Sequence, residues 1–444
     1  MSMYYGEQLA MDTGAGAQSR PASTVACSPT AKWASSILLI SILIGVIGRE
    51  WTWLQSMSGA LYGPIIGLGA IGILCAGIMV GAFSSAGKRF LLIGWFFAAV
   101  ITKQFYHTPY DMPLDVEAWH VLVAYAVAAI AGLAGLHMGM DSASARWFLT
   151  RSARIFAVIS IVAFVCGAPP AGTHLVFPSM YVGFPMRLFV LFPFCWYLDK
   201  WLQGGWISKS LIGLAASSLS VIVVFHKPIV FSGAVAALAI AFLQVRRGNF
   251  VRSLARFAIL GGICIAGFIV VDTMQDGRLS DQYLDSVYKN FFHRDRATFN
   301  AMNADEIWEA WSGGRFKLWD TAMVRFDASP IFGTGVGQRI WTSSGIIPLH
   351  NQYLDFLLSV GIFGSIPVVL TGVLWAKAAL RRSRGPDADW VVPVVAFAVG
   401  IGAYGIGGTP NQFPFLCALL FFCMGMVAAP VSSYTGYRER GNIG

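Results

Sequence analysis

The chain consists of long apolar stretches separated by short polar segments. A helix that crosses a bilayer needs about 20 mostly apolar residues. Twelve stretches approach that length, and we predict a membrane-spanning helix for each. They are Lys32–Gly48, Leu61–Phe83, Phe90–Tyr106, Ala118–Met138, Ile155–Gly167, Phe184–Trp201, Ile207–His226, Pro228–Gln244, Leu254–Val271, Tyr353–Leu380, Trp390–Gly408 and Phe413–Ala429. The fifth is short, and its helix could begin near Phe148. Since only a tight turn at His226-Lys227 parts the seventh and eighth, one longer broken element is an alternative there.

This pattern predicts an all-α polytopic membrane protein with about 12 transmembrane helices and one large periplasmic loop. The predicted parts are a disordered cytoplasmic tail (1–31), spans one to nine (32–271), the loop (272–349), spans ten to twelve (350–430) and a second cytoplasmic tail (431–444). No signal-peptide pattern precedes the first apolar run at Trp33.

Composition agrees with a membrane protein. Hydrophobic residues make up 56% and charged residues 12% of the 444 positions, with a mean hydropathy of +0.63. A soluble protein averages about 25% charged residues, so this chain could not cover a water-exposed surface. The pattern excludes an ordinary cytosolic enzyme, a disordered chain and a disulfide scaffold.

The net charge of +9 comes from alternate loops that carry most of the Lys and Arg residues. The opposite loops hold only Arg49, Lys103, Arg187 and Lys227, apart from the long loop. Positive charges mark the cytoplasmic side of membrane proteins. We therefore predict that both termini are cytoplasmic and that the loop 272–349 is periplasmic.

Two features that could suggest a metal or nucleotide site are weak. The seven cysteines lack zinc-type spacing, and we expect most to be small buried hydrophobes. Asp387-Ala388-Asp389 is a D-x-D, a metal-nucleotide signature of many glycosyltransferases. It falls on the predicted cytoplasmic side, away from the long loop, so we expect a solvated loop with no catalytic role.

The long loop contains two predicted helices. Asn303 followed by Glu306 is a capping-box pattern that opens a helix through Trp311. Phe316, Trp319, Met323 and Phe326 then share one helix face, and Pro330 ends that helix. We expect this face to pack against the membrane domain. Trp308, Trp311, Trp319 and Trp341 differ from the tryptophans that flank spans, and one or two of them are candidates to contact sugar rings.

Three groups near the end of the loop could carry chemistry. Arg315 follows Gly313-Gly314 at a helix start, where free amides and the helix dipole attract anions. A solvated loop arginine is the alternative. Gly333, Gly335 and Gly337 alternate with Thr334 and Val336, but no strand–turn–helix context supports a dinucleotide site. We expect a flexible turn that brings backbone close to the bilayer or to a substrate.

The third group is His350-Asn351, at the mouth of the tenth predicted span, with Tyr353 and Asp355 just inside. Ionisable groups there are costly unless they face a cavity or a partner. A histidine can accept a proton near neutral pH. A histidine that merely lies at the membrane interface is the alternative interpretation.

Taken together, these motifs resemble the O-antigen ligase/polymerase superfamily. The resemblance rests on S-G-G-R, P-x-x-G-x-G-x-G, H-N-x-Y-L-D and G-x-x-G between Ser312 and Gly364, and the layout of spans extends it over most of the chain. The superfamily includes O-antigen ligases, O-antigen and exopolysaccharide polymerases, and protein O-oligosaccharyltransferases.

The resemblance implies an enzyme of the bacterial inner membrane that transfers a glycan from undecaprenyl diphosphate to an acceptor hydroxyl. It implies no cofactor, metal or nucleotide sugar. Arg315 would bind the diphosphate, and His350 would contact the acceptor or the diphosphate, with general base as one role. Asn351, Asp355 and the three glycines of the loop would support them. The implied partners are the lipid-linked glycan, membrane lipid and a chain-length regulator of polysaccharide assembly, without nucleic acid.

A further cation is expected from an earlier span. The superfamily usually has an arginine there, whereas this chain has Lys227 between His226 and Pro228. Lysine keeps the charge but loses the forked donor geometry of arginine. Arg187, in the outer half of the sixth span, is another candidate to bind the diphosphate, and snorkelling to the interface is its alternative.

The function we predict is polymerisation of lipid-linked repeat units into a surface polysaccharide or exopolysaccharide. Transfer to lipid A-core, as in lipopolysaccharide biosynthesis, is the runner-up, and protein glycosylation is third. The alternatives outside enzymes are a transporter of polysaccharide precursors and a structural subunit of an assembly complex. A transporter would favour charges near the bilayer midplane and paired halves, neither of which the sequence shows.

Overall fold

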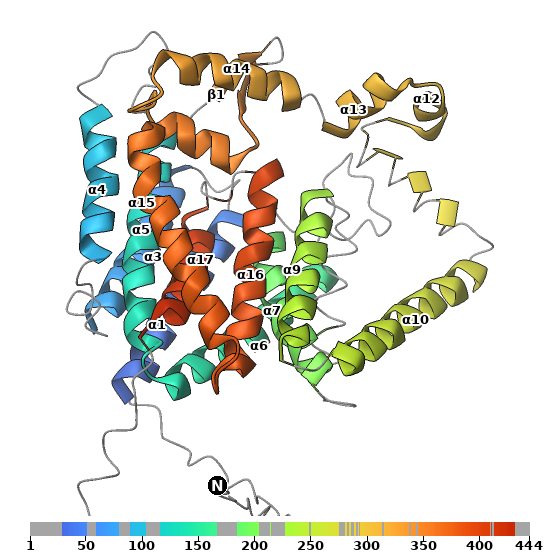
Figure 1. Cartoon of the computed structure of the whole chain (residues 1–444), viewed down its shortest axis with the longest axis horizontal. Helices are drawn as coiled ribbons and strands as arrows, with labels where there is room; N and C mark the ends of the chain where they lie inside the picture. The colour runs from blue at the N-terminus through green and yellow to red at the C-terminus, as the bar shows by residue number, and fades with distance from the viewer. Residues whose placement is uncertain are drawn as a thin grey trace, which may run out of the picture.

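The computed structural model describes residues 29–50, 59–79, 89–103, 116–166, 184–203, 214, 227–247, 250–274, 280–281, 284–285, 288–289, 292, 294–312, 315–336, 339–342, 345–408, 410 and 413–430. Within these ranges the chain is a helical bundle, with α10 projecting from one side and α14 lying across one end (Figure 1).

Helices occupy eleven of the twelve predicted spans. They are α1 (Pro29–Glu50), α3 (Gly59–Met79), α4 (Arg89–Lys103), α5 (Val116–Met138), α6 (Ser142–Cys166), α7 (Phe184–Gln203), α9 (Lys227–Val245), α10 (Phe250–Met274), α15 (Gln352–Arg382), α16 (Ala388–Gly407) and α17 (Pro414–Ala428). The predicted seventh span lies outside the described residues except for Leu214. The helix of the fifth predicted span begins at Ser142. Its first turns are polar, so the apolar run in the sequence begins later than the helix does.

Four helices among the described residues are long and apolar enough to cross a membrane: Val121–Met138, Pro228–Val245, Gln352–Arg382 and Ala388–Gly407. This supports a membrane protein, whereas the count of about 12 spans stays a prediction. The domain boundaries and the periplasmic placement of the loop also stay predictions.

The core lies where α5 and α17 pack closely along each other. Glycines let the two backbones meet: a methyl group on Gly135 would lie 2.0 Å from the carbonyl oxygen of Phe422. A methyl group on Gly425 would lie 2.1 Å from the carbonyl oxygen of Gly132. Small residues at such crossings are typical of helix pairs in membranes.

The predicted loop is a small folded layer. It contains α12 (Arg296–Asn300), α13 (Ala304–Ser312), α14 (Arg315–Ala328) and an antiparallel hairpin of β1 (Arg339–Thr342) and β2 (Gly345–Pro348). The hairpin corrects the all-α prediction in detail. Its alternating register pairs Ile340 with Ile347, and β-branched residues favour strands.

The capping box at α13 is confirmed. The Glu306 backbone N–H donates to Asn303 Oδ1, and the Asn303 N–H donates to Glu306 Oε2, both at 2.9 Å. The predicted packing face of α14 is partly wrong. Ala322, with Leu318 and Phe326, packs against Leu349 and Leu358. Phe316 and Met323 are exposed. The packed face of α14 is centred on Ala322, one residue before Met323 of the predicted stripe.

Candidate functional site

Arg315 is the first residue of α14, as the sequence predicted, and it reaches the end of another helix. A methyl group on Gly407, the last residue of α16, would lie 3.1 Å from Arg315 Nη1 and 3.7 Å from Pro228 Cγ. The guanidinium of Arg315 therefore lies where the end of α16 meets the beginning of α9. Glycine at position 407 is what leaves room for it.

The guanidinium of Arg315 is partly withdrawn from water. Burial lowers its pKa, and the nearby phenol of Tyr404 acts in the opposite direction. An arginine still carries its charge at neutral pH after such a shift. Tyr404 is buried in α16, and its ring underlies Gly408. A fixed cation with a half-buried surface is suited to hold an anion.

His350 lies beside Arg315 with a strained backbone. Its φ of 51° makes it the one non-glycine residue with positive φ in the described part of the chain. Such conformations cost about 1–3 kcal/mol and cluster at functional sites. Burial and the positive charge of Arg315 both lower the pKa of the His350 imidazole. Both effects favour the neutral imidazole, the form that can accept a proton.

Two side chains fix the backbone on either side of His350. Asn351 is the N-cap of α15, and its Oδ1 accepts from the N–H groups of Tyr353 at 3.0 Å and Leu354 at 3.1 Å. Trp319 of α14 donates its indole N–H to the carbonyl oxygen of Leu349 at 3.3 Å. Asn351 therefore caps α15 directly after His350.

The first turn of α15 is bound to the last turns of α16. The N–H of Gln352 donates to the carbonyl oxygen of Gly408 at 3.0 Å. The Tyr353 hydroxyl donates to the carbonyl oxygen of Gly402 at 2.7 Å. Both contacts use the glycine-rich end of α16, where side chains would hold α15 away. These hydrogen bonds hold the beginning of α15, which follows His350, against the end of α16, which contacts Arg315.

Gly333 does not form part of a phosphate loop in this structure but supports a break in α15. The helix contains one non-helical residue, Gly361, with φ of 62°. A methyl group on Gly333 would lie 2.4 Å from the Leu358 carbonyl oxygen, and one on Gly361 would lie 2.2 Å from the Ile331 carbonyl oxygen. Both glycines have positive φ, so both need the freedom that glycine has.

The loop also satisfies the backbone groups that the break leaves unpaired. The Thr334 N–H donates to the Leu358 carbonyl oxygen at 2.6 Å. The N–H groups of Ile362 and Phe363 donate to the carbonyl oxygens of Pro330, at 2.9 Å, and Ile331, at 3.0 Å. Unpaired backbone groups are costly inside a membrane protein. The loop backbone approaches α15 closely, and the expected approach to a substrate or the bilayer stays a prediction.

The remaining predicted site residues are placed less fully. Asp355 lies buried in the first turn of α15, with its N–H donating to the Asn351 carbonyl oxygen at 2.9 Å. Lys227 begins α9 next to Pro228, and Arg187 lies in α7, but their side chains lie outside what the structure describes. Gly335 has a φ of 101°, and Gly337 lies outside the described residues.

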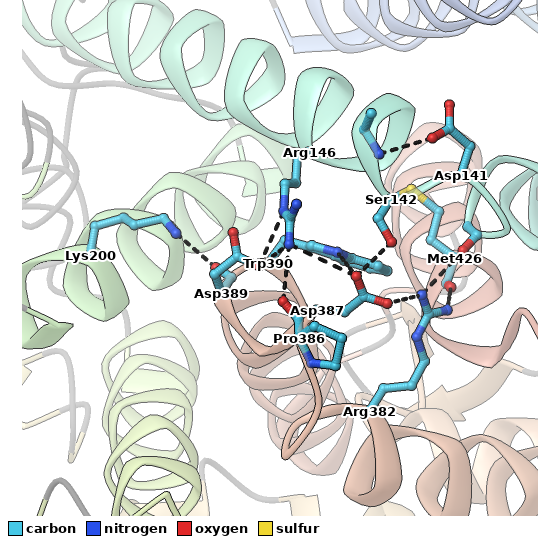
Figure 2. Close-up of polar contacts among 12 residues, drawn as sticks. Asp141, Ser142, Arg146, Lys200, Arg382, Pro386, Asp387, Asp389, Trp390 and Met426 are labelled. Carbon is cyan, nitrogen blue, oxygen red and sulfur yellow. Dashed lines mark hydrogen bonds and ion pairs between the residues drawn. The ribbon is translucent and has the colours of Figure 1, made fainter. Parts of the chain in front are cut away.

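The D-x-D motif forms a structural cluster, which corrects the prediction of a solvated loop (Figure 2). Asp387 accepts hydrogen bonds from Ser142 Oγ at 2.5 Å, from Arg382 Nη2 at 2.6 Å and from Trp390 Nε1 at 3.3 Å. Burial acts to raise the pKa of Asp387, but these hydrogen bonds and the charge of Arg382 lower it overall. The carboxylate is buried because it neutralises a buried arginine.

The second carboxylate of the motif is also engaged. Asp389 Oδ1 accepts from Arg146 Nη2 at 2.9 Å, and its backbone oxygen accepts from Lys200 Nζ at 2.8 Å. We call Ser142, Arg146, Arg382, Asp387 and Asp389 the polar clasp. It joins α6 and α15 to the beginning of α16. In the described part of the chain, no group of three or more His, Cys, Asp or Glu side chains could hold a metal ion.

The polar clasp and the candidate site lie at opposite ends of α16. Asp387 is the N-cap of this 20-residue helix, and Gly407 is its last residue. Such a helix is about 30 Å long, which is the thickness of the hydrocarbon core of a bilayer. The D-x-D therefore lies far from Arg315 and His350.

Sequence reasoning missed two contributors. Tyr404 was not singled out, and Trp319 was expected to pack or to contact a sugar ring, not to hold the backbone beside His350. The signal for Tyr404 was available in the glycine-rich run from Gly400 to Gly408, which predicts close approach of other elements. The hydrogen bond of Trp319 depends on the tertiary contact of α14 with α15 and leaves no pattern in the chain.

A comparison with known families agrees with this geometry. Residues 210–369 match the family model described as O-antigen ligase. The match includes Lys227, Arg315 and His350, and it confirms the resemblance to the O-antigen ligase/polymerase superfamily. No curated protein matches the chain. The family consists of membrane glycosyltransferases that use lipid-linked glycans, and the apolar helices fit a bacterial membrane protein.

Proposed function

We propose that this chain polymerises undecaprenyl-diphosphate-linked oligosaccharide repeat units into a surface polysaccharide or exopolysaccharide at the periplasmic face of the inner membrane. The observation that carries the proposal is that Arg315 lies against the end of α16, that α15 is bound to that end directly after His350, and that the charge of Arg315 acts on His350. A fixed cation and a neutral base in one half-buried site match the two needs of glycan transfer from a lipid diphosphate.

The proposed reaction forms one bond and breaks one. The oxygen of an acceptor sugar hydroxyl attacks the anomeric carbon of the donor glycan, and the bond from that carbon to the diphosphate oxygen breaks. His350 accepts the hydroxyl proton, which its lowered pKa allows at neutral pH. Arg315 offsets the charge that grows on the departing lipid diphosphate, a task that metal ions perform in other enzymes.

Lys227 and Arg187 are proposed to bind the same diphosphate. The support for Lys227 is its position directly before Pro228, whose ring approaches Gly407 together with Arg315. The support for Arg187 is its place in α7, which packs against both α9 and α16. We also propose that the termini are cytoplasmic. Arg146, Lys200 and Arg382 lie together at the far end of the bundle, in agreement with the positive-inside rule.

Transfer to lipid A-core is the second candidate, and the description of the matching family as O-antigen ligase favours it. Both activities use the same donor and leaving group. They differ in the acceptor, which the residues at Arg315 and His350 do not distinguish. The proposed function therefore has to be decided by supplying each acceptor separately.

The test is an assay with purified protein and undecaprenyl-diphosphate-linked repeat units from the host, with products separated on a gel. Nucleotide is omitted, and parallel reactions contain EDTA. We expect a ladder of lengthening chains, unchanged by EDTA. Consumption of donor only after addition of lipid A-core or of a protein would overturn polymerisation in favour of transfer to that acceptor. No consumption under any condition would contradict an enzyme and favour a transporter or a structural subunit.

Variants test the site in the same assay. Arg315→Ala and His350→Ala should each abolish transfer while the protein still inserts and purifies. Asp389→Ala, at the opposite end of α16, is the matched control and should retain transfer. Lys227→Arg should retain transfer if its charge binds diphosphate. Normal polymer from Arg315→Ala or His350→Ala would remove that residue from the site, and an inactive Lys227→Arg would contradict the role of Lys227.

A further inference from the structure

Two tryptophans stand exposed on α13, the helix that precedes Arg315. Trp308 is 59% exposed and Trp311 is 43% exposed. Their ring centroids lie 5.5 Å apart at an interplanar angle of 87°. An edge-to-face pair holds both rings in place. Two exposed indoles side by side form an apolar patch among polar residues, and such patches often mark a binding site.

The helix that carries them is capped at its beginning and contacts α14. The reciprocal bonds of Asn303 and Glu306 fix its beginning. At its end, Glu309 forms an ion pair with Lys317 of α14, so α13 is tied to the helix that begins with Arg315. The indoles are therefore presented on a capped helix beside α14.

Charge argues against the membrane surface as the partner of these rings. Helices that lie on a bilayer carry Lys and Arg beside their apolar face, because anionic lipids attract them. The exposed neighbours of Trp308 and Trp311 on α13 are Asp305, Glu306 and Glu309. Carboxylates repel lipid headgroups of the same sign, but they accept hydrogen bonds from hydroxyl groups.

The position of the pair is close to the site. Trp311 precedes Arg315 by four residues, so their Cα atoms are at most about 14 Å apart. In Figure 1, α13 lies at the same end of the bundle as α14, above and to the right of α9. A glycan whose diphosphate lies at Arg315 would have its first sugars within reach of these rings.

We propose that Trp308 and Trp311 form a stacking platform for the sugar rings of the lipid-linked glycan, adjoining the diphosphate site. One indole face covers the apolar C–H face of a sugar ring, the other indole, nearly perpendicular, borders that ring, and Asp305 accepts hydrogen bonds from its hydroxyls. This inference rests on the proposed function for its link to Arg315. The platform contributes to binding of the glycan and takes no part in bond making.

The first test separates the platform from the transfer reaction. Isothermal titration calorimetry with the full-length protein uses the host repeat-unit oligosaccharide without lipid or diphosphate. We expect the Trp308→Ala/Trp311→Ala double variant to bind about tenfold more weakly than wild type, since two ring contacts are lost. Trp308→Phe/Trp311→Phe should bind within about threefold of wild type, because the stacking faces remain. Trp33→Ala, an exposed tryptophan on α1, is the control.

The second test uses kinetics. With a donor that carries the full repeat unit, the double Ala variant should raise KM about tenfold and leave kcat within twofold. With a donor that carries a single sugar on the diphosphate, KM should rise less than with the full repeat unit, because fewer sugars reach the rings. Equal oligosaccharide affinity and equal KM in wild type and the double Ala variant would overturn the platform. If wild type binds the free oligosaccharide through these tryptophans but transfers nothing, the platform stands and the proposed function fails.

A third measurement addresses the membrane as partner. The protein is reconstituted in vesicles that contain brominated lipids, which quench nearby indoles. We expect the quenching of total tryptophan fluorescence to be the same in wild type and in Trp308→Phe/Trp311→Phe. A clear loss of quenching in that variant, without loss of oligosaccharide binding, would assign the pair to the bilayer and overturn the proposal.

Discussion

The indole N–H of Trp319 donates a hydrogen bond of 3.3 Å to the carbonyl oxygen of Leu349, the residue directly before His350. Trp319 and Arg315 are four residues apart, so they share a face of α14. The same helix thus supplies the candidate cation and holds the strained backbone of the candidate base. The relative position of Arg315 and His350 is fixed through one rigid element.

Replacing Trp319 should loosen His350 without unfolding the chain. Trp319→Phe keeps an aromatic ring beside Phe316 but removes the hydrogen bond. A hydrogen bond contributes about 0.5–1.5 kcal/mol, so we expect kcat to fall roughly threefold to tenfold with little change in KM. Kinetics in the repeat-unit assay check this, with Trp33→Phe as the control. A fully active Trp319→Phe would show that the bond does not position His350.

The acidic limb of the pH profile should report His350. Burial and Arg315 lower its pKa, so the imidazole of the free enzyme stays neutral below the usual value of about 6.5. Since kcat/KM reports groups of the free enzyme, the inflection of its acidic limb should lie below the usual histidine value of about 6.5. Measuring kcat/KM between pH 4.5 and 8 is the check. An inflection above 6.5 would contradict the neutral base.

Gly333 and Gly361 should tolerate no side chain. Each has positive φ, which costs other residues about 1–2 kcal/mol. Each also faces backbone atoms of the other segment, which cannot move aside easily. We therefore expect Gly333→Ala and Gly361→Ala to lower the midpoint of thermal unfolding in detergent by several degrees.

Gly372→Ala is the matched control for these two variants. Gly372 lies in the same helix, α15, and nothing lies within 4 Å of a methyl group added there. Alanine favours a helix over glycine by about 0.5–1 kcal/mol, so this variant should unfold at an equal or higher temperature. If all three variants behaved alike, the loop would not support the break in α15.

The polar clasp should matter for stability and not for chemistry. Asp387→Ala leaves the buried Arg382 without its carboxylate, and breaking a buried pair costs about 3–5 kcal/mol. Asp389→Ala breaks an ion pair at the surface, which is worth at most about 1 kcal/mol. Thermal unfolding should separate the two variants clearly. If Asp387→Ala unfolded at the same temperature as wild type, the motif would behave as the solvated loop that the sequence suggested.

The clasp also predicts how stability depends on pH. The folded pKa of Asp387 is lowered, so its contribution is complete above the unfolded value of about 3.9. The contribution is lost as the pH falls through the folded pKa, which lies below that value. Wild type should therefore lose stability on acidification below about pH 4, and Asp387→Asn should lose less over the same range. Unfolding midpoints at pH 3 to 6 test the difference.

The sequence predicted the helices well because long apolar runs leave few alternatives in a membrane. It also predicted the beginning of α14 at Arg315 and the capping box of α13, since both depend on neighbours a few residues away. It misjudged Asp387, because a polar tripeptide near basic residues looks solvated until Arg382 and Ser142 are known to surround it. The break at Gly361 was equally hidden, since its partner Gly333 lies 28 residues earlier.

The stripe of α14 shows the same limit on a smaller scale. Phe316 and Met323 are apolar and correctly spaced for a helix, yet the helix turns Ala322 toward Leu349 and Leu358. Periodicity finds that a helix has an apolar face. The choice between two adjacent stripes depends on the shape of the surface that α14 covers, which the local sequence does not contain.

The two ends of α16 have a consequence for the membrane that can host this protein. The polar clasp, with its partly exposed Arg146 and Asp389, lies at one end and Arg315 lies at the other, with about 30 Å of helix between them. A bilayer of matching thickness accommodates both. A thicker bilayer would draw one charged cluster into hydrocarbon, or would tilt α16 and shift Gly407 beneath Arg315. Lipid chain length is therefore a physical variable that acts on this site from outside the protein.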